Sequence, residues 1–383
     1  MKTLKLSIRK DALGEAIGHV IRAVSPRPVI PILGGIRLDA DARGLTLTAS
    51  DTDMTIQSFI PAEKDGEPVV RLEGDGSLVL GAKFFSEIVR KLPTDTVELE
   101  ATDARRAVIR SGNAEIELVG MDPDEYPVMP SVADAAHFQA GGLQLKQLIH
   151  RTVFAVSANE STPILTGVLW QLSEGRLKLT ATDRHRLSKA ECAVSADPDL
   201  KLDQLVIAGR TLNELSRLIP DDGTVIDVQA TDSQVLFRMD GILFHSRLLD
   251  GTYPDTSRII TNQYKTELVM STRELADAIE RAYLLSREEK TNIVRLSTVG
   301  GGEIEVSSSS LEIGKVTERI RPDHLAGEDL KIAFNSRYML DALKVIDSEK
   351  IHIGFTGPMS PILLRPDRDP DMLHLILPYR TTT

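Results

Sequence analysis

A ten-residue helical pattern occurs three times in this chain at constant spacing. Residues 83–92 (KFFSEIVRKL), 210–219 (RTLNELSRLI) and 337–346 (RYMLDALKVI) align without gaps, and their starts are 127 residues apart. Each copy has a basic residue at its first and eighth positions and an acid at its fifth, with apolar residues at helical spacing on the other side. The chain therefore consists of three equivalent units, which favours an arc or a ring of similar domains.

Shorter motifs repeat with nearly the same period. PILGG at 31–35 returns as PILTG at 163–167, and LTLTASD at 45–51 returns as LKLTATD at 177–183. Tyr126-Pro127 returns as Tyr253-Pro254, whereas the third unit is more diverged. A unit of this length is domain-sized and can bury its own core. We therefore expect three domains, at residues 1–130, 136–257 and 263–383.

The first unit shows which elements each domain should contain. Helical periodicity covers residues 9–24 and 83–92, and Pro93 ends the second of these helices. Alternating apolar residues joined by short turns predict antiparallel strands, near residues 4–8, 32–38, 45–49, 54–60, 77–80, 97–101, 107–110 and 115–119. The predicted class is α+β, with two helices per domain packed on antiparallel sheets.

The charge is unevenly distributed along the chain. The formal net charge is −11, which by itself argues against binding a polyanion. The three later helices and their earlier counterparts at 9–24, 144–156 and 271–286 nevertheless sum to +6, which leaves −17 for the sheets and loops. If the helices share one surface, that surface is positive on an acidic protein. Exposed Lys–Glu pairs along any helix are the alternative explanation.

Composition also bears on the compartment. The single cysteine, Cys192, cannot form an internal disulfide, which fits a reducing cytoplasm, and we interpret it as a small core residue. The first ten residues alternate like a strand rather than a signal peptide. No apolar run approaches the ~18 residues of a membrane span. We expect a cytoplasmic protein.

Motifs for catalysis are missing from the sequence. It contains no phosphate loop, no H-E-x-x-H, no G-x-S-x-G and no dinucleotide fingerprint. Asp51 and Asp53 could share a hard cation, and Asp183 with His185 could act as a general-acid pair. Both pairs follow a predicted strand, where Asp commonly bonds the backbone of a turn. We expect no catalytic residue, no metal and no cofactor.

Several longer motifs resemble one family. RPVIPILGG at 27–35, ATDRHRL at 181–187, LDGTYPD at 249–255, FNSRY at 334–338 and LPYR at 377–380 occur in the order found in the bacterial DNA polymerase III beta subunit family, the replicative sliding clamps. The resemblance covers essentially all 383 residues. It implies a head-to-tail homodimer that closes into a ring, with helices lining the hole. Such a ring would encircle double-stranded DNA without reading its sequence.

The resemblance also implies a peptide-binding pocket between the second and third domains. Its partners would be the replicative polymerase subunit, the clamp loader, repair polymerases and mismatch-repair proteins. Carried over by position, the pocket residues are Leu165, Thr182, Arg184, His185, Arg186, Leu187, Pro254, Ile259, Asn335, Tyr338, Met359, Leu375, Leu377, Pro378, Tyr379 and Arg380. Without the resemblance, the alternating residues Leu375, Leu377 and Tyr379 describe an ordinary final strand.

The ring implies two further sets of residues. The basic helix faces and two nearby arginines provide the expected DNA contacts, which are Arg27, Lys83, Arg90, Lys146, Arg151, Arg210, Arg217, Arg258, Arg337 and Lys344. The expected dimer interface opposes basic and apolar residues of the first domain to apolar and acidic residues of the third, namely Lys83, Arg105, Arg106, Ile116 and Leu118 against Leu284, Leu285, Glu312 and Glu318.

This chain departs from the family pattern at three places. Arg184 stands where many relatives have glycine, so the rim of the pocket can differ. Thr162-Pro163-Ile164 stands where some relatives place aromatic residues near DNA, and Lys315 and Arg319 interrupt the acidic surface of the third domain. The alternative functions are a peptide-binding scaffold that does not encircle DNA, a second-copy clamp variant, and an enzyme using Asp51, Asp53, Asp183 and His185.

Overall fold

The computed structural model describes residues 4–25, 27–103, 105–128, 135–288, 291–310 and 312–380. Each repeat contributes two α-helices. They are α1 (Lys10–Val20) and α2 (Ala82–Lys91), α3 (Gly142–Val153) and α4 (Gly209–Leu218), and α5 (Thr272–Glu288) and α6 (Ser336–Leu343). The six predicted helices are all present, and their bounds shift by a few residues at the ends.

The chain divides into two compact units. The first comprises Met1–Leu143 with Arg217–Leu248, and the second comprises Gln144–Ser216 with Leu249–Thr383. These units do not coincide with the three sequence repeats, because the middle repeat contributes strands to a sheet in each unit.

In the first unit, one long antiparallel sheet runs in the order β12-β18-β19-β20-β4-β3-β2-β8-β11-β10-β9-β1-β7. The strands of the first repeat are β1 (Lys5–Arg9), β2 (Gly35–Asp41), β3 (Gly44–Ser50), β4 (Met54–Pro61), β7 (Val70–Gly74), β8 (Gly76–Gly81), β9 (Thr96–Asp103), β10 (Arg106–Ser111) and β11 (Ala114–Met121), with a small hairpin of β5 (Glu63–Lys64) and β6 (Glu67–Pro68). The middle repeat adds β12 (Ala136–Gly141), β18 (Val225–Ala230), β19 (Gln234–Met239) and β20 (Ile242–Arg247).

The second unit holds a 9-stranded sheet, β17-β13-β14-β15-β29-β28-β27-β21-β25, and a 4-stranded sheet, β24-β23-β22-β26. The middle repeat supplies β13 (Gly167–Ser173), β14 (Arg176–Thr182), β15 (Arg186–Ala193) and β17 (Leu202–Ala208), whereas its two-residue strand β16 (Ser195–Ala196) belongs to neither of these sheets. The third repeat supplies β21 (Thr266–Ser271), β22 (Ile293–Val299), β23 (Glu303–Ser310), β24 (Gly314–Ile320), β25 (His324–Gly327), β26 (Lys331–Asn335), β27 (Lys350–Phe355), β28 (Ile362–Pro366) and β29 (Met372–Ile376).

Two seams join strands of successive repeats. In the first seam β4 pairs with β20, and Ile56 lies opposite Phe244. In the second seam β15 pairs with β29, and Ser188 lies opposite His374. Since Ile56 and Ser188 are 132 residues apart, the repeats pair in the same register at both seams.

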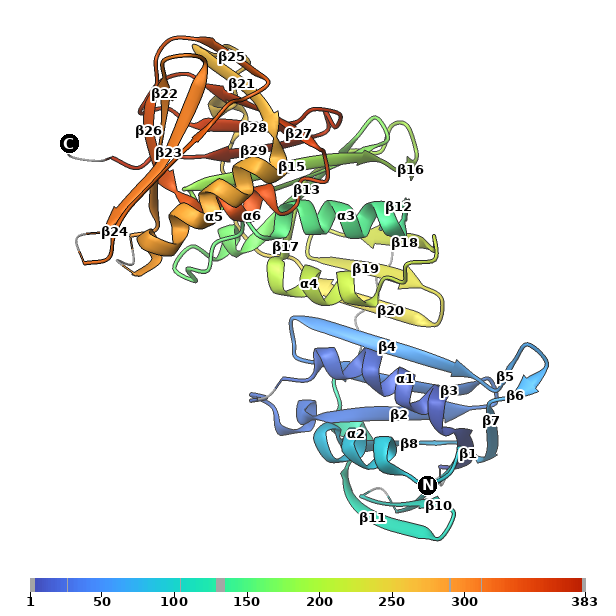
Figure 1. Cartoon of the computed structure of the whole chain (residues 1–383). Helices are drawn as coiled ribbons and strands as arrows, with labels where there is room; N and C mark the ends of the chain where they lie inside the picture. The colour runs from blue at the N-terminus through green and yellow to red at the C-terminus, as the bar shows by residue number, and fades with distance from the viewer. Residues whose placement is uncertain are drawn as a thin grey trace. The chain divides into compact units, whose positions relative to one another are not determined.

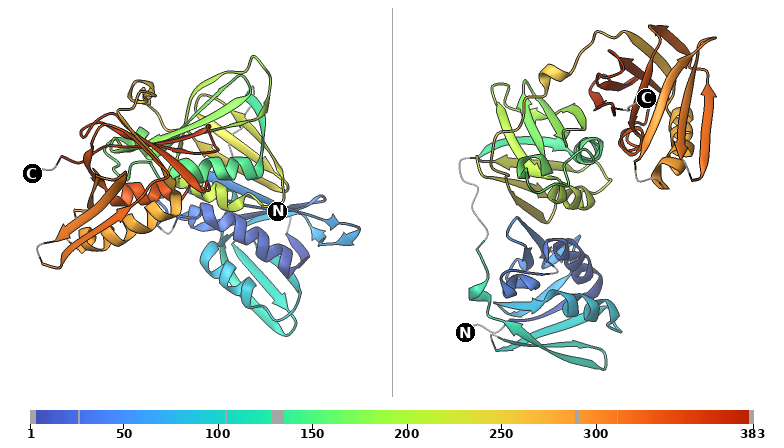
Figure 2. Two further views of the ribbon diagram at one scale, coloured as in Figure 1. Left: turned by 45° about the horizontal axis from the view of Figure 1, so that its top comes forward. Right: turned by 90° about the vertical axis from the view of Figure 1, so that its left-hand side faces the viewer.

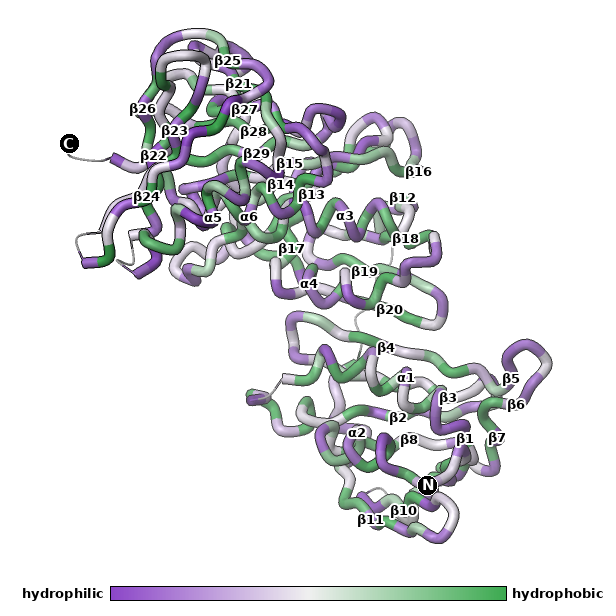
Figure 3. Tube along the Cα trace, in the orientation of Figure 1, coloured by the Kyte–Doolittle hydropathy of each residue, from purple (hydrophilic) through white to green (hydrophobic). Residues whose placement is uncertain are grey.

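The helices lie on the sheets through their apolar faces. In the first unit α1 packs on β3 and β4, and α2 packs on β2 and β8, so both cover the same face (Figure 1). Figure 2 shows them, in blue and cyan, on one side of the strands. Leu13 and Ile17 of α1 and Phe85 and Val89 of α2 are at most 2% exposed. Figure 3 shows hydrophobic residues along the central strands and hydrophilic residues in the β5–β6 hairpin.

The predicted strand positions are close to those observed, with two differences. The strand expected at 32–38 begins only at Gly35, because Pro31–Gly34 forms a 3₁₀ turn that starts with a proline. Three strands of the first repeat were not predicted: the two-residue strands β5 and β6, and β7, which pairs with β1 and so depends on a partner far away in the chain. Among the described residues, no helix is both long and apolar enough to cross a membrane.

Candidate functional site

A cavity of about 550 Å³ opens in the second unit, where the turn between β14 and β15 meets the start of α6. Six of the predicted pocket residues line it: Leu165, Arg184, His185, Arg186, Asn335 and Tyr338. The remaining lining residues were missed as pocket residues, and they are Val156, Ser157, Ala158, Asn159, Thr162, Asp183, Asn292, Arg337 and Asp341.

The turn at one wall is held by the Asp183 carboxylate. Its Oδ1 accepts hydrogen bonds from the backbone N–H groups of His185 and Arg186, both at 2.9 Å. The Thr182 hydroxyl donates to the carbonyl of Arg186 at 2.7 Å and accepts from the N–H of Arg184. These bonds hold Arg184 at φ +73°, in the left-handed region. The turn therefore presents three consecutive cationic or imidazole side chains in a fixed order.

Arg186 joins the turn to the third repeat. Its guanidinium donates to Asp183 at 3.1 Å and to Asp341 of α6 at 2.6 Å. The same group lies over the Tyr338 ring at 4.5 Å and near the Phe154 ring at 5.4 Å. The side chains of Arg186 and Asp183 are both 12% exposed, so water screens this ion pair poorly. A charge held on two carboxylates and two rings gives the pocket a rigid floor.

The opposite wall is the first turn of α6. Asn335 caps this helix by accepting hydrogen bonds from the N–H groups of Arg337 and Tyr338. The Tyr338 ring stacks on the His185 ring with centroids 6.3 Å apart. Partial burial raises the pKa of the Tyr338 hydroxyl, so it is neutral and can donate a hydrogen bond.

The segment after the last strand is hydrogen-bonded to elements beside the cavity. The N–H of Leu377 donates to the His185 carbonyl at 2.8 Å, and the N–H of Tyr379 donates to Ala333 at 2.7 Å. Leu375 packs in a buried cluster with Leu187. The C-terminal segment is thus bonded to the turn that forms one wall and to β26, the strand that leads into α6.

The other predicted pocket residues do not line the cavity. Thr182, Leu187 and Leu375 are buried, whereas the others are partly or fully exposed, namely Pro254, Ile259, Met359, Leu377, Pro378, Tyr379 and Arg380. Two of the missed residues carried a signal in the sequence. Arg337 and Asp341 occupy the first and fifth positions of the repeated helix, where we read them as part of a polar stripe.

The predicted DNA contacts are exposed, except Lys146 and Arg151, which are half-buried. Arg151 makes an ion pair with Asp369 at 2.8 Å, so its charge is already partly balanced. The predicted contacts on α2, α4 and α6 occupy equivalent positions of the repeated helix, because the sequence pattern places a basic residue at its first and eighth positions. Each of these helices therefore exposes a basic stripe opposite its buried face.

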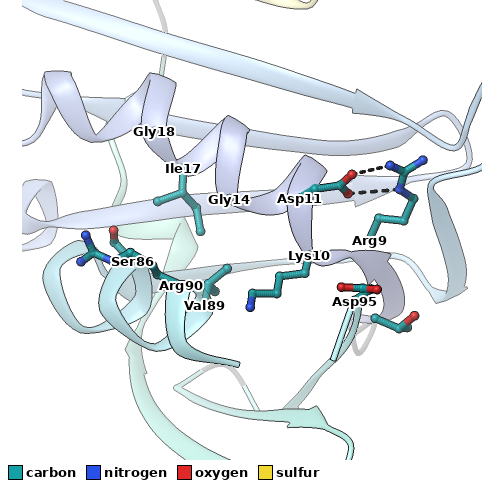
Figure 4. Close-up of a pocket in the computed structure, with 11 residues that line it drawn as sticks. Arg9, Lys10, Asp11, Gly14, Ile17, Gly18, Ser86, Val89, Arg90 and Asp95 are labelled. Carbon is teal, nitrogen blue, oxygen red and sulfur yellow. Dashed lines mark hydrogen bonds and ion pairs between the residues drawn. The ribbon is translucent and has the colours of Figure 1, made fainter. Parts of the chain in front are cut away.

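A cavity of about 990 Å³ lies between α1 and α2 (Figure 4). Gly14 and Gly18 of α1 border it, and a Cβ atom at either would meet open space. Lys10 donates from Nζ to the carbonyl of Leu92 at 2.6 Å, whereas Arg90 makes no ion pair within the described part of the chain. At this cavity Arg90 of α2 is exposed, whereas Lys10 of α1 is half-buried.

The predicted dimer residues lie on several elements: Lys83 on α2, Arg106 on β10, Ile116 and Leu118 on β11, Leu284 and Leu285 on α5 and Glu318 on β24, with Arg105 before β10 and Glu312 before β24. Ile116 and Leu118 are half-buried on β11, and Leu284 on α5 is 53% exposed. Glu318 of β24 accepts two hydrogen bonds from Arg281, at 2.6 and 2.8 Å, and this pairing lowers the pKa of the Glu318 carboxyl. Part of the acidic surface expected for a partner is therefore used within the subunit.

The residues considered for catalysis serve turns. Asp51 Oδ1 accepts from the N–H groups of Asp53 and Met54 at 3.1 and 2.9 Å, in the same arrangement as Asp183. The Asp183 carboxylate bonds the backbone of His185 rather than its ring. In the part of the chain that the structure describes, no three His, Cys, Asp or Glu side chains form a group that could hold a metal ion.

Comparison with known proteins gives consistent matches along the chain. Residues 4–130, 142–255 and 257–380 match the DNA polymerase III beta subunit N-terminal, central and C-terminal domains. The chain is 47% identical to the beta sliding clamp of Bacillus subtilis (strain 168) over 99% of its own length and 100% of that protein. It is 44% identical to the beta sliding clamp of Halalkalibacterium halodurans, over 98% of this chain and 99% of the relative.

Solved structures agree with these matches. The crystal structure of the DNA polymerase sliding clamp from Bacillus subtilis superimposes with a TM-score of 0.96 at 46% identity and covers 99% of both chains. That of the DNA polymerase III beta chain from Streptococcus pneumoniae gives 0.94 at 36% identity and covers 99% of this chain and 100% of that one.

Proposed function

The chain belongs to the DNA polymerase III beta subunit family, and we propose that two copies close head to tail into a ring around duplex DNA. The family assignment makes the chain a sliding clamp, an accessory subunit rather than the catalytic subunit of the polymerase. The ring would work in the cytoplasm, where it would hold the replicative polymerase subunit, the clamp loader, repair polymerases and mismatch-repair proteins on DNA.

The basic helices carry this proposal. Positive charge on the helices, against the acidic remainder of the chain, would attract the phosphates of a duplex that passes through the hole. Contacts with phosphates alone fix no sequence register, so the ring can slide. We assign the three repeats to domains at 1–130, 136–257 and 263–383; residues 1, 130 and 383 lie outside the described residues.

Two unpaired strand edges support closure of the ring. Residues 114–119 of β11 pair with β10 on one side, and only Gly120 and Met121 of this strand reach β8 on the other. β24 is the outer strand of its sheet, and within the described residues it pairs with β23 alone. Open edges of this kind readily pair with another chain. We propose that β11 of one copy meets β24 of the next, with Ile116 and Leu118 against Leu284 and Leu285.

The decisive experiment uses DNA topology. Loaded onto nicked circular DNA, the protein should be retained, and it should be lost after the circle is linearised. Replacing Arg210 and Arg217 with Glu should weaken loading on all sequences alike, because phosphate contacts carry no sequence information. Retention that ignores topology, or a strict monomer in sedimentation equilibrium at micromolar concentration, would contradict the ring.

The Leu284→Asp substitution tests the proposed interface. It should shift the equilibrium from dimer toward monomer relative to wild type, since a buried unpaired charge costs several kcal/mol.

A second experiment tests the pocket. Removal of residues 377–383, of which 381–383 lie outside the described residues, should abolish binding of short peptides from the replicative polymerase while the dimer persists. The intact protein should bind them in the micromolar range, about 8 kcal/mol. Tyr379→Ala provides a milder variant that keeps the strand. Calorimetry showing equal affinity for intact, truncated and substituted proteins would place the partner site elsewhere.

A further inference from the structure

The rim of the pocket carries positive charge that the fold does not use. Both acids of the cavity wall, Asp183 and Asp341, bond the guanidinium of Arg186. Arg184 and Arg337 line the same cavity, are exposed, and make no ion pair with any carboxylate of the described residues. A ligand that enters the pocket therefore meets two arginines without acidic partners, and two carboxylates that already pair with Arg186.

The two arginines lie on one rim because neighbouring residues hold their elements together. His185, next to Arg184, stacks on Tyr338, next to Arg337. The Arg184 guanidinium comes no closer than 3.5 Å to the Thr162 hydroxyl, a contact too long to fix it. The start of α6 adds the positive end of a helix dipole to the same wall.

The backbone conformation of Arg184 has a free-energy cost. Its φ of +73° belongs to the region that glycine occupies freely, and a side chain there costs about 1 kcal/mol or more. No other polar contact of its side chain within the described residues offsets this cost. A planar guanidinium binds a carboxylate through two parallel hydrogen bonds, which a glycine at this position could not do.

We infer that Arg184, supported by Arg337, makes the pocket select partner segments that carry an acidic side chain beside their apolar anchors. The inference rests on the proposed peptide-binding function of this pocket. The apolar part of such a segment would use Leu165 and the exposed Leu377 and Tyr379, while its carboxylate would lie over the rim. Arg184 would thus be a residue that determines specificity rather than overall affinity.

The test compares two short synthetic peptides that share leucine and phenylalanine anchors and carry either Asp or Asn at the flanking positions. Calorimetry on the full chain should show the Asp peptide binding wild type about threefold to fivefold more tightly, as expected for an exposed ion pair. Arg184→Gln should reduce this ratio to about one with little change for the Asn peptide, and Arg184→Lys should keep part of it. High salt should reduce the wild-type ratio in the same way.

A matched control separates charge from backbone strain. Thr52 has φ +83° at the equivalent position of the first repeat, outside the cavity, so Thr52→Gly should leave the Asp/Asn ratio unchanged. If Arg184→Gln leaves the Asp/Asn ratio unchanged, this inference is overturned while the proposed pocket stands. If Arg184→Gln also weakens loading on DNA at that unchanged ratio, the arginine contacts phosphate instead. If wild type binds neither peptide, the pocket assignment fails and this inference fails with it.

Discussion

The two seams between repeats have the same backbone hydrogen bonding but carry different side chains. At the first, the Asp51 turn precedes β4, and the N–H of Arg247 donates to the carbonyl of Asp53 at 2.9 Å. At the second, the Asp183 turn precedes β15, and the N–H of Leu377 donates to His185 at 2.8 Å. The hydrogen bonds that the turn acid and the preceding hydroxyl make with the backbone are the same in both arrangements.

The two seams differ in the side chains at equivalent positions. Met54 of the first seam is 1% exposed and apolar, whereas its counterpart Arg186 bonds two carboxylates. Phe244 of the first seam corresponds to His374 of the second, and both ring nitrogens of His374 are buried without a hydrogen-bond partner. The repeat therefore supplies the turn and the strand pairing at both seams, and a few substitutions make the second seam a charged pocket.

The largest effect should come from giving the second seam the residue of the first. Arg186→Met would leave Asp183 and Asp341 without their cation, which should cost about 3 kcal/mol of unfolding free energy and abolish peptide binding. The single tryptophan, Trp170, is buried in β13 of this unit, so its fluorescence in urea follows the loss. Met54→Leu is the matched control and should cost less than about 1.5 kcal/mol with no change in peptide affinity. Equal effects of the two substitutions would remove the distinction between the seams.

An intermediate effect should appear with pH. Burial lowers the pKa of His374 to about 3, from 6.5 in an unfolded chain. The unfolded state therefore binds one more proton between these values, and stability falls as pH drops below 6.5, by about 1.4 kcal/mol per unit. His374→Phe, the residue of the first seam, should remove this slope and add about 1 kcal/mol at pH 7 by eliminating unsatisfied nitrogens.

Urea denaturation of wild type and variant at pH 7, 6 and 5 measures that difference. His245 and His19 should leave a residual slope in both proteins, because burial lowers their pKa values as well. Parallel pH profiles would mean that His374 is protonated in the folded state.

The smallest effect concerns the strained turns. Thr52→Gly and Arg184→Gly should each stabilise the protein by up to about 1 kcal/mol, reduced by the greater chain entropy of glycine when unfolded. Thr52→Gly should stabilise the protein more than Arg184→Gly, since a β-branched side chain tolerates the left-handed region least. Hydrogen exchange of the amides that follow each turn would report the two gains separately, and a loss of protection in either variant would show that its side chain supports the turn.

The sequence alone was enough to predict the repeated elements. Helices were recognisable because the stripe of residues 83–92 recurs twice at constant spacing, and Asp51 and Asp183 were correctly interpreted as turn residues. The turn inference depends on neighbours within a few residues, and the helix inference depends on a local pattern that the chain repeats.

Contacts between distant segments were beyond such reasoning. Arg186 and Asp341 are 155 residues apart, and only the folded chain brings them to 2.6 Å. The strand β7 was missed for the same reason, since local periodicity says nothing about which strand lies alongside. The 3₁₀ turn at Pro31–Gly34, by contrast, is a local feature that begins with a proline. The pocket residues came from family resemblance, which supplied six of the lining residues and missed others, among them Arg337 and Asp341.

Strand pairing across the repeats also limits how this chain can be dissected. The middle repeat provides β20 to one sheet and β15 to another, and each of these strands is hydrogen-bonded to a strand of a different repeat. A fragment cut at the repeat boundaries would expose the backbone groups of both strands at once, and such edges recruit other chains. The middle repeat expressed alone should therefore aggregate, and two adjacent repeats form the smallest fragment that keeps a seam intact.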